Sequence, residues 1–232
     1  MSLETIPRFV ARTEQGYKLK QLEHLNKLRN LQIDGLRFVT SKEEALEANL
    51  ACKNLLTELE MNFYSHDSAC NPDVQAAVLE GLSPSKHLVH LKIEDYSGSS
   101  YPSWMLYPSW SGLNSGAPTE LYSLELFRCS PLVSIPKGSG YFIRLHKLCF
   151  SRCRWSCMPL EMEHLESLQE LTISLCGRIK HLSELPKSLK LVTITGKSKL
   201  WKTCQKQGHQ NYQKIQHIPN KEFPVETDDL LY

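Results

Sequence analysis

Cysteine and histidine are the side chains of this 232-residue chain that could bind a metal ion or take part in nucleophilic catalysis. Three of the eight cysteines follow one another four residues apart, at Cys149, Cys153 and Cys157. A zinc site usually combines closer cysteine pairs with a second pair of ligands, and the sequence offers no second pair near this run. The spacing therefore favours a structural role for these thiols over a metal site.

The nine histidines do not indicate an active site. They are scattered along the chain at His24, His66, His87, His90, His146, His164, His181, His209 and His217. No Ser-His-Asp or Cys-His arrangement can be traced among them. We therefore expect no catalytic residue, no metal ligand and no cofactor in this chain, and we predict that it is not an enzyme.

The cysteines belong instead to a repeated phrase of aliphatic residues. The phrase is Leu121-x-x-Leu124-x-Leu126-x-x-Cys129, then Leu145-x-x-Leu148-x-Phe150-x-x-Cys153, Leu168-x-x-Leu171-x-Ile173-x-x-Cys176, and Leu189-x-x-Val192-x-Ile194. The four copies begin 24, 23 and 21 residues apart, which is the period of a leucine-rich repeat. Residues two apart on a strand share one face, so each copy predicts a short strand with one apolar side.

One such unit cannot bury its apolar side alone, so the units must stack. Three earlier and longer units carry the same phrase, and the predicted strands lie near 31–33, 59–61, 91–93, 124–126, 148–150, 171–173 and 192–194. We predict an α/β fold, a leucine-rich-repeat solenoid or horseshoe. Its parallel sheet forms the concave face, and irregular and helical segments form the convex face. Residues 1–21 are the expected lead-in, 22–200 the repeats, and 201–232 a C-terminal cap and tail.

Two helices and an aromatic loop are predicted between the early strands. Ser41-x-x-Glu44 is a capping box, so a helix should begin at Lys42 and continue to about Asn54. Asn71-Pro72 should begin a second helix that ends near Gly81. A tandem Tyr-Pro-Ser-Trp motif covers 101–104 and 107–110, and we expect Trp104 and Trp110 to pack against their surroundings rather than bind a ligand.

Composition narrows the class of protein further. The net charge of +2 gives no general attraction to nucleic acid or membranes. No apolar run approaches the ~18 residues of a membrane helix, and residues 1–20 lack the apolar segment of a secretory signal. An Asn-x-Ser/Thr glycosylation site is also absent from the sequence. These features favour a cytoplasmic protein, with the nucleus as a second compartment, over an extracellular receptor.

Four segments, taken in order, carry a family likeness. They are Leu31–Val39 with Glu43–Lys53; Val78–Pro84 with Leu88–Gly98 and Tyr101–Trp104; Leu124–Pro136; and Gly208–Pro219. Together they resemble the leucine-rich-repeat region of plant intracellular NLR disease resistance proteins, the coiled-coil class typical of cereals. The doubled Tyr-Pro-Ser-Trp departs from that pattern. No G-x-x-x-x-G-K-S/T phosphate-binding motif occurs in the chain, so we expect a fragment or a truncated gene product.

The resemblance implies a function. In such receptors the repeats recognise a pathogen effector, or a host protein modified by one, and restrain a nucleotide-binding NB-ARC module that is absent from this chain. ADP or ATP would bind to that missing module. A substrate-recruiting subunit of a ubiquitin ligase is the alternative, although residues 1–27 show no adaptor-binding helical motif.

The strand positions that alternate with the core leucines predict a protein-binding surface. Exposed aromatic residues beside arginine are typical of binding hot spots. The predicted contact residues on the concave face are Phe63, Lys92, Tyr122, Glu125, Phe127, Arg128, His146, Lys147 and Arg152. Because the residues from Tyr122 to Arg152 include several cations, we expect the middle of this surface to prefer an acidic partner.

Overall fold

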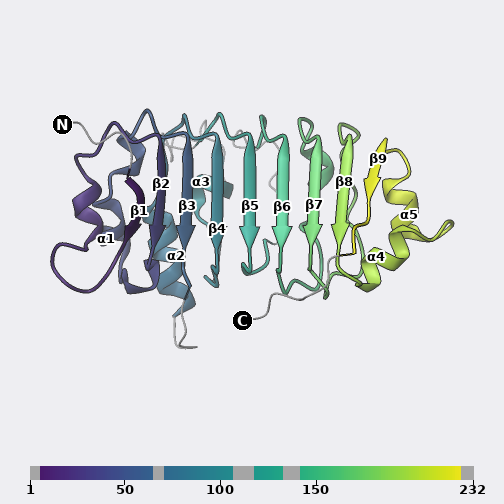
Figure 1. The fold of residues 1–232 in the computed structure, drawn as a ribbon, viewed down its shortest axis with the longest axis horizontal. Helices are drawn as coiled ribbons and strands as arrows, with labels where there is room; N and C mark the ends of the chain where they lie inside the picture. Colours follow the sequence, from purple (N-terminus) through teal and green to yellow (C-terminus); the bar gives the residue numbers. More distant parts are fainter. Residues whose placement is uncertain (1–5, 65–70, 107–117, 133–141, 226–232) are drawn as a thin grey trace.

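A computed structural model describes residues 6–64, 71–106, 118–132 and 142–225. The strands of these residues form one parallel sheet of nine members in which each strand pairs with the next along the chain (Figure 1). The strands are β1 (Ile6–Val10), β2 (Asn30–Asp34), β3 (Glu58–Asn62), β4 (His90–Glu94), β5 (Ser123–Phe127), β6 (Lys147–Ser151), β7 (Glu170–Ser174), β8 (Leu191–Thr195) and β9 (Asn220–Glu222). The prediction of a leucine-rich-repeat solenoid is confirmed.

The apolar phrase forms the core because equivalent residues stack in register. Leu124 of β5 lies between Leu91 and Leu148 of its neighbours, and Leu126 is aligned in the same way with Ile93 and Phe150. All of these side chains are buried. The leucine three residues before each pair is also buried, as at Leu121 and Leu145. The solenoid is therefore stabilised by one continuous apolar spine shared by all units.

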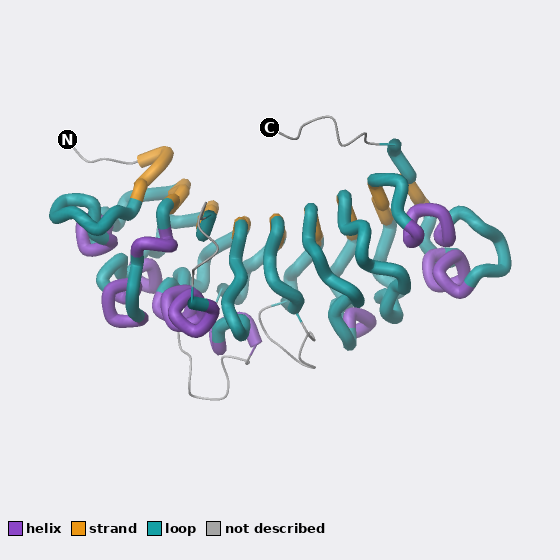
Figure 2. Tube along the Cα trace, turned by 90° about the horizontal axis from the view of Figure 1, so that it is seen from below, coloured by secondary structure: helices purple, strands orange, loops and turns teal. Residues whose placement is uncertain are grey.

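The body is arched, with the sheet on its concave side and the helices on its convex side (Figure 2). The α-helices are α1 (Lys42–Leu46), α2 (Pro72–Gly81), α3 (Ser103–Leu106), α4 (Lys199–Cys204) and α5 (Gln210–Ile215). Short 3₁₀ turns occupy Leu19–Leu22, Leu36–Phe38, Leu50–Cys52 and Met162–His164. Because the helices lie on the far side, they leave the outward face of the sheet uncovered.

Local signals place both early helices. The Ser41 hydroxyl accepts a hydrogen bond from the Glu44 amide at 3.2 Å, and the Asn71 side chain accepts one from the Asp73 amide at 2.9 Å. These are the predicted N-caps. The first helix is shorter than expected, because α1 ends at Leu46 and Asn49 adopts a left-handed backbone with φ of 50°.

The aromatic anchor of the loop after β4 is buried as expected. The Trp104 indole nitrogen donates to the Leu79 carbonyl at 3.0 Å, which ties α3 to α2. Tyr101 is also buried, and its hydroxyl donates to the Ser130 carbonyl at 2.9 Å. Trp110 lies outside the described residues.

The three cysteines of the repeat column are structural. Each thiol lies within hydrogen-bond distance of a carbonyl one unit earlier: Cys129 at 3.2 Å from Ile93, Cys153 at 3.4 Å from Leu126, and Cys176 at 3.5 Å from Phe150. Burial raises the pKa of the Cys129 thiol well above its ordinary value, so the sulfur remains a protonated donor. The thiols satisfy carbonyl groups that face the core.

The strand ends turn in a regular way. Asp95, Arg128, Arg152 and Leu175, each the residue directly after a strand, have φ values of 56, 52, 51 and 52°. This left-handed residue turns the chain so that the next one, Tyr96 or a column cysteine, enters the core. Four successive units therefore hold the residue that follows each strand at the same rim of the sheet.

Two strands extend the sheet beyond the seven predicted from the leucine spacing. At one end, β1 pairs with β2, and the Ala11 amide donates to the Asp34 carbonyl at 2.8 Å. At the other end, β9 pairs with β8. The segment expected to be only a lead-in thus contributes a strand, and so does the segment expected to be a cap.

Candidate protein-binding surface

The outward residues of the sheet form three columns between two rims. The column in the middle of the strands begins with Gln32, Glu60, Lys92 and Glu125, which are aligned across β2 to β5. Residues just before the strands form one rim, and the left-handed residues just after them form the other. The residues of the two rims are six positions apart along each strand, so the rims are separated by ~20 Å.

Tyr122 and His146 lie together on the rim before the strands. Their rings stack with centroids 4.7 Å apart and planes 16° apart, and His90 approaches Tyr122 edge-on at 6.0 Å. Nδ1 of His146 lies 2.6 Å from the Arg144 carbonyl, so this nitrogen carries a proton and donates to that oxygen. The other ring nitrogen, Nε2, does not take part in this hydrogen bond. Tyr122 remains 36% exposed, which makes it an aromatic contact surface held in one orientation.

Arg128 lies on the opposite rim, beside Phe127, which is the last outward residue of β5. The Arg128 guanidinium pairs with both carboxylate oxygens of Asp95 at 2.7 Å, and it lies 4.7 Å from the Phe127 ring centroid and 5.6 Å from that of Tyr64. Burial raises the pKa of Asp95, as does the neighbouring Glu94, although the arginine opposes that rise. Arg152 directly follows the next strand, β6, and has the same backbone conformation.

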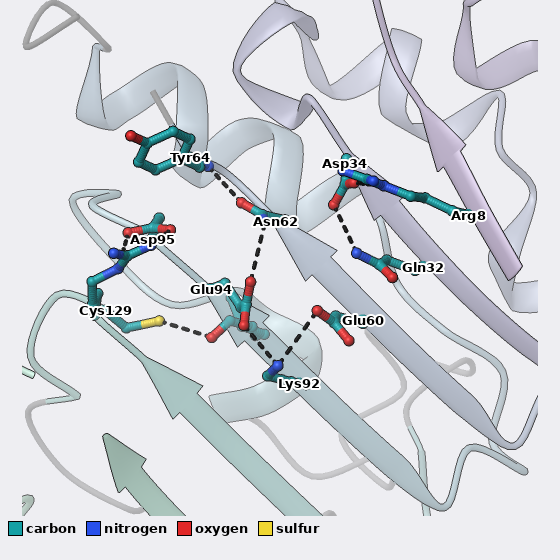
Figure 3. A network of polar contacts seen from close by, with 12 residues as sticks. Arg8, Gln32, Asp34, Glu60, Asn62, Tyr64, Lys92, Glu94, Asp95 and Cys129 are labelled. Atoms are coloured by element: carbon teal, nitrogen blue, oxygen red, sulfur yellow. Dashed lines mark hydrogen bonds and ion pairs between the residues drawn. The ribbon is translucent and has the colours of Figure 1, made fainter. Parts of the chain in front are cut away.

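The remaining predicted residues lie on the floor between the rims. Nζ of Lys92 pairs with Glu94 at 2.7 Å and with Glu60 at 3.4 Å (Figure 3). Lys147 pairs with Glu170 at 2.8 Å. Glu125 is half-buried beside Lys92. The cations that were expected to favour an acidic partner are therefore largely paired within the chain.

Phe63 does not belong to the surface, and its assignment to the concave face was wrong. It is 1% exposed and packs edge-to-face on Tyr96 at 5.2 Å. Phe63 does not have the positive φ of the residues that follow β4 to β7, and its side chain continues the inward alternation of Leu59 and Met61.

The other predicted residues do not form one patch. Tyr122 and His146 form a pair on one rim, Arg128 and Phe127 lie together at the other, and Lys92, Glu125 and Lys147 lie on the floor between the rims. Three residues that complete these groups were not among the predicted contact residues: Asp95, Tyr64 and Glu94. The repeat spacing does place Glu94 and Asp95 on the concave face, but it does not indicate that they pair with Lys92 and Arg128. Tyr64 follows an irregular turn, and no repeat position indicated it.

The three cysteines of the four-residue run do not converge. Cys153 is buried, Cys149 is on the floor, and Cys157 is exposed. Burial, with the charge of Glu125, raises the pKa of Cys149 to about 12. Within the described residues no group of three histidine, cysteine or acidic side chains is placed to hold a metal ion. No helix of the described part has the length and apolarity needed to cross a bilayer.

The in-register ladder and its uncovered concave face define a leucine-rich-repeat protein. The family model described as R13L1/DRL21 LRRs matches residues 19–153, and the chain belongs to this family. It is similar to disease resistance protein RGA4 of Solanum bulbocastanum, with 28% identity over 134 residues, covering 58% of this chain and 13% of that protein.

Two further relatives come from Arabidopsis thaliana. Disease resistance RPP13-like protein 1 is 29% identical over 136 residues, covering 55% of this chain and 12% of that protein. Disease resistance protein At3g14460 is 30% identical over 143 residues, covering 58% of this chain and 10% of that protein. The chain therefore corresponds to a small part of the length of these plant disease resistance proteins.

Proposed function

We propose that this chain is the recognition region of an intracellular plant immune receptor. It binds a pathogen effector, or a host protein modified by one, and in a full-length receptor it also contacts an NB-ARC module and holds that module inactive. Recognition would shift the receptor between two states by differential contact. Adenine nucleotide would bind to that module and not to these residues.

The observation that carries this proposal is the uncovered sheet face with fixed aromatic and arginine contacts at both rims. Tyr122 is held by stacking on His146, and Arg128 is held by Asp95 and two rings. Side chains that are already ordered lose little entropy on binding, which is typical of interface hot spots. The relatedness to disease resistance proteins supports a role in defence rather than in another repeat-based pathway.

Two measurements test the proposal. Sequencing the full-length transcript should reveal an in-frame G-x-x-x-x-G-K-S/T motif upstream of Met1. In a leaf assay with the receptor and its matching effector, Tyr122→Ala combined with Arg128→Ala should abolish effector-triggered cell death at unchanged protein level. A control, Tyr17→Ala, changes an exposed tyrosine near the N-terminus and should leave the response intact. An unchanged response in the rim variant would rule out these rims as the recognition site.

A further inference from the structure

The floor of the concave face carries an uneven distribution of charge. The outward positions of β2 to β5, all of which the structure describes, hold five carboxylates and one lysine. These residues are Asp34, Glu58, Glu60, Glu94, Glu125 and Lys92. The equivalent positions of β6 to β8 hold one ion pair, Lys147 with Glu170, and otherwise uncharged side chains. The acidic character is therefore confined to one half of the sheet.

This acidic half is hollowed. A trough of about 370 Å³ crosses β2 to β5 and is lined by Glu58, Glu60 and Glu125 together with His90 and Lys92. Neighbouring strands lie ~4.8 Å apart, so the trough runs for ~15 Å across four strands. That length matches four to five residues of an extended peptide, at ~3.3 Å each.

The cations near the trough are already engaged. Lys92 is held between Glu60 and Glu94, and Arg8 of β1 pairs with Asp34 (Figure 3). Within the described part of the chain, Glu58 has the neutral Asn30 amide, at 2.7 Å, as its only hydrogen-bond partner. Glu125 makes no hydrogen bond or ion pair with another described residue. Among the described residues neither Glu58 nor Glu125 therefore has an ion-pair partner, and the two residues lie ~12 Å apart, offset by two strands and by two residues along the strand.

The pKa shifts of Lys92 and Cys149 agree with an excess of negative charge in the trough. Burial alone would lower the pKa of Lys92, but the hydrogen bond and charge of Glu94, followed by the charges of Glu60 and Glu125, raise it. The pKa of Cys149, raised first by burial, is raised further by Glu125. One lysine therefore does not neutralise the trough.

We propose that the trough over β2 to β5 docks a basic segment of a partner protein, with lysine or arginine side chains reaching Glu58 and Glu125. The inference rests on the proposed function, because it takes the partner to be a protein. The ligand proposed for the N-terminal half of the concave face is basic, whereas the sequence predicted an acidic partner. Glu125 is half-buried, so a cation that reaches it forms a stronger charge-assisted contact than one at the exposed Glu58.

The test uses the 232-residue chain and two labelled synthetic peptides of equal length, one with lysine alternating with serine and the other with glutamate alternating with serine. Fluorescence anisotropy at low salt should show binding of the lysine peptide only, and salt should weaken it because the contacts are ionic. Glu58→Gln with Glu125→Gln should weaken binding about five- to tenfold. These substitutions keep the side-chain shape, and circular dichroism verifies that the variant is folded.

The matched control is Glu43→Gln with Glu47→Gln, which removes the same charge from exposed positions at α1 on the convex side. Its affinity should stay within about twofold of the parent chain. Equal weakening in both double variants, binding of the glutamate peptide, or no binding of either peptide would overturn the proposal. Such a failure does not touch the immune-receptor assignment, which the leaf assay with the Tyr122 and Arg128 variant tests separately.

Discussion

Arg128 and Asp95 join the ends of β5 and β4 through a two-point ion pair, with both N–O distances at 2.7 Å. Each residue has a left-handed backbone, which places the two side chains at the same rim. The pair links neighbouring units outside the apolar spine. It also holds the guanidinium beside the rings of Phe127 and Tyr64.

The first prediction concerns this pair. Arg128→Ala should destabilise the chain by ~1 kcal/mol, because Asp95 is largely buried and would lose its cation. A double-mutant cycle with Asp95→Asn, followed by urea unfolding, should give a coupling energy of about 1 kcal/mol. Arg152→Ala, at the same position of the next unit, is the control and should cost less. A coupling energy near zero would mean that the pair only orients the guanidinium.

The second prediction follows from the burial of Phe63. Phe63→Ala should lower the free energy of unfolding by ~3–5 kcal/mol, because a large ring is removed from a packed contact with Tyr96. Its neighbour Tyr64 is 39% exposed, and Tyr64→Ala should cost much less. Thermal unfolding followed by circular dichroism compares the two. Similar melting temperatures for both variants would contradict the placement of Phe63 in the core.

The third prediction concerns Lys53, whose side chain is fully buried. Its ammonium donates to the Leu22 carbonyl at 2.5 Å and approaches the carbonyls of Glu23 and Leu25 at 3.4 Å, closing the 3₁₀ turn at the N-terminal end of the repeats. Lys53→Met would keep the apolar stem but leave these carbonyls without their donor. The expected loss is ~1–3 kcal/mol in urea unfolding.

Lys86→Met is the matched control for Lys53, because Lys86 is exposed. It should change the free energy of unfolding by less than ~0.5 kcal/mol. Equal stability of the Lys53 and Lys86 variants would show that water replaces the buried ammonium at no cost.

The fourth prediction is a pH dependence at Glu44. Burial acts to raise the pKa of this carboxyl, but the hydrogen bond and charge of Lys18 and the bonds from Thr40 outweigh it, so the pKa lies below its ordinary value of 4.5. A lowered folded-state pKa stabilises the fold above the unfolded-state pKa, and this contribution is lost as pH falls through the folded-state value.

The test of this dependence is Glu44→Gln. The variant should be less stable than the parent by ~1 kcal/mol at pH 7, and the difference should shrink as the pH falls below 4.5. Glu43→Gln, one residue earlier and exposed, should show no such change. A constant difference across this range would mean that packing, not charge, is what Glu44 contributes.

Much of the solenoid could be predicted from the sequence because its determinants are local or periodic. The Leu-x-x-Leu-x-Leu spacing is enough to place the strands β2 to β8, since residues two apart on a strand must share a face. The helix starts at Ser41 and Asn71 follow from their side chains, which accept a hydrogen bond from the amide three residues later and two residues later, respectively. The column of cysteines follows from its constant offset to the strands.

Only the tertiary structure decided which outward residues pair and which strands complete the edges. The strand β9 is polar and three residues long, so it forms only because β8 offers a pairing edge. Phe63 and Arg128 follow their strands directly, yet the backbone turns left-handed only at Arg128, so one is buried and the other exposed. Likewise, the pairing of Lys92 with Glu60 and Glu94 depends on register across strands far apart in the chain. Repetition in the sequence determines the spine, while the charge and shape of its open face depend on contacts between units.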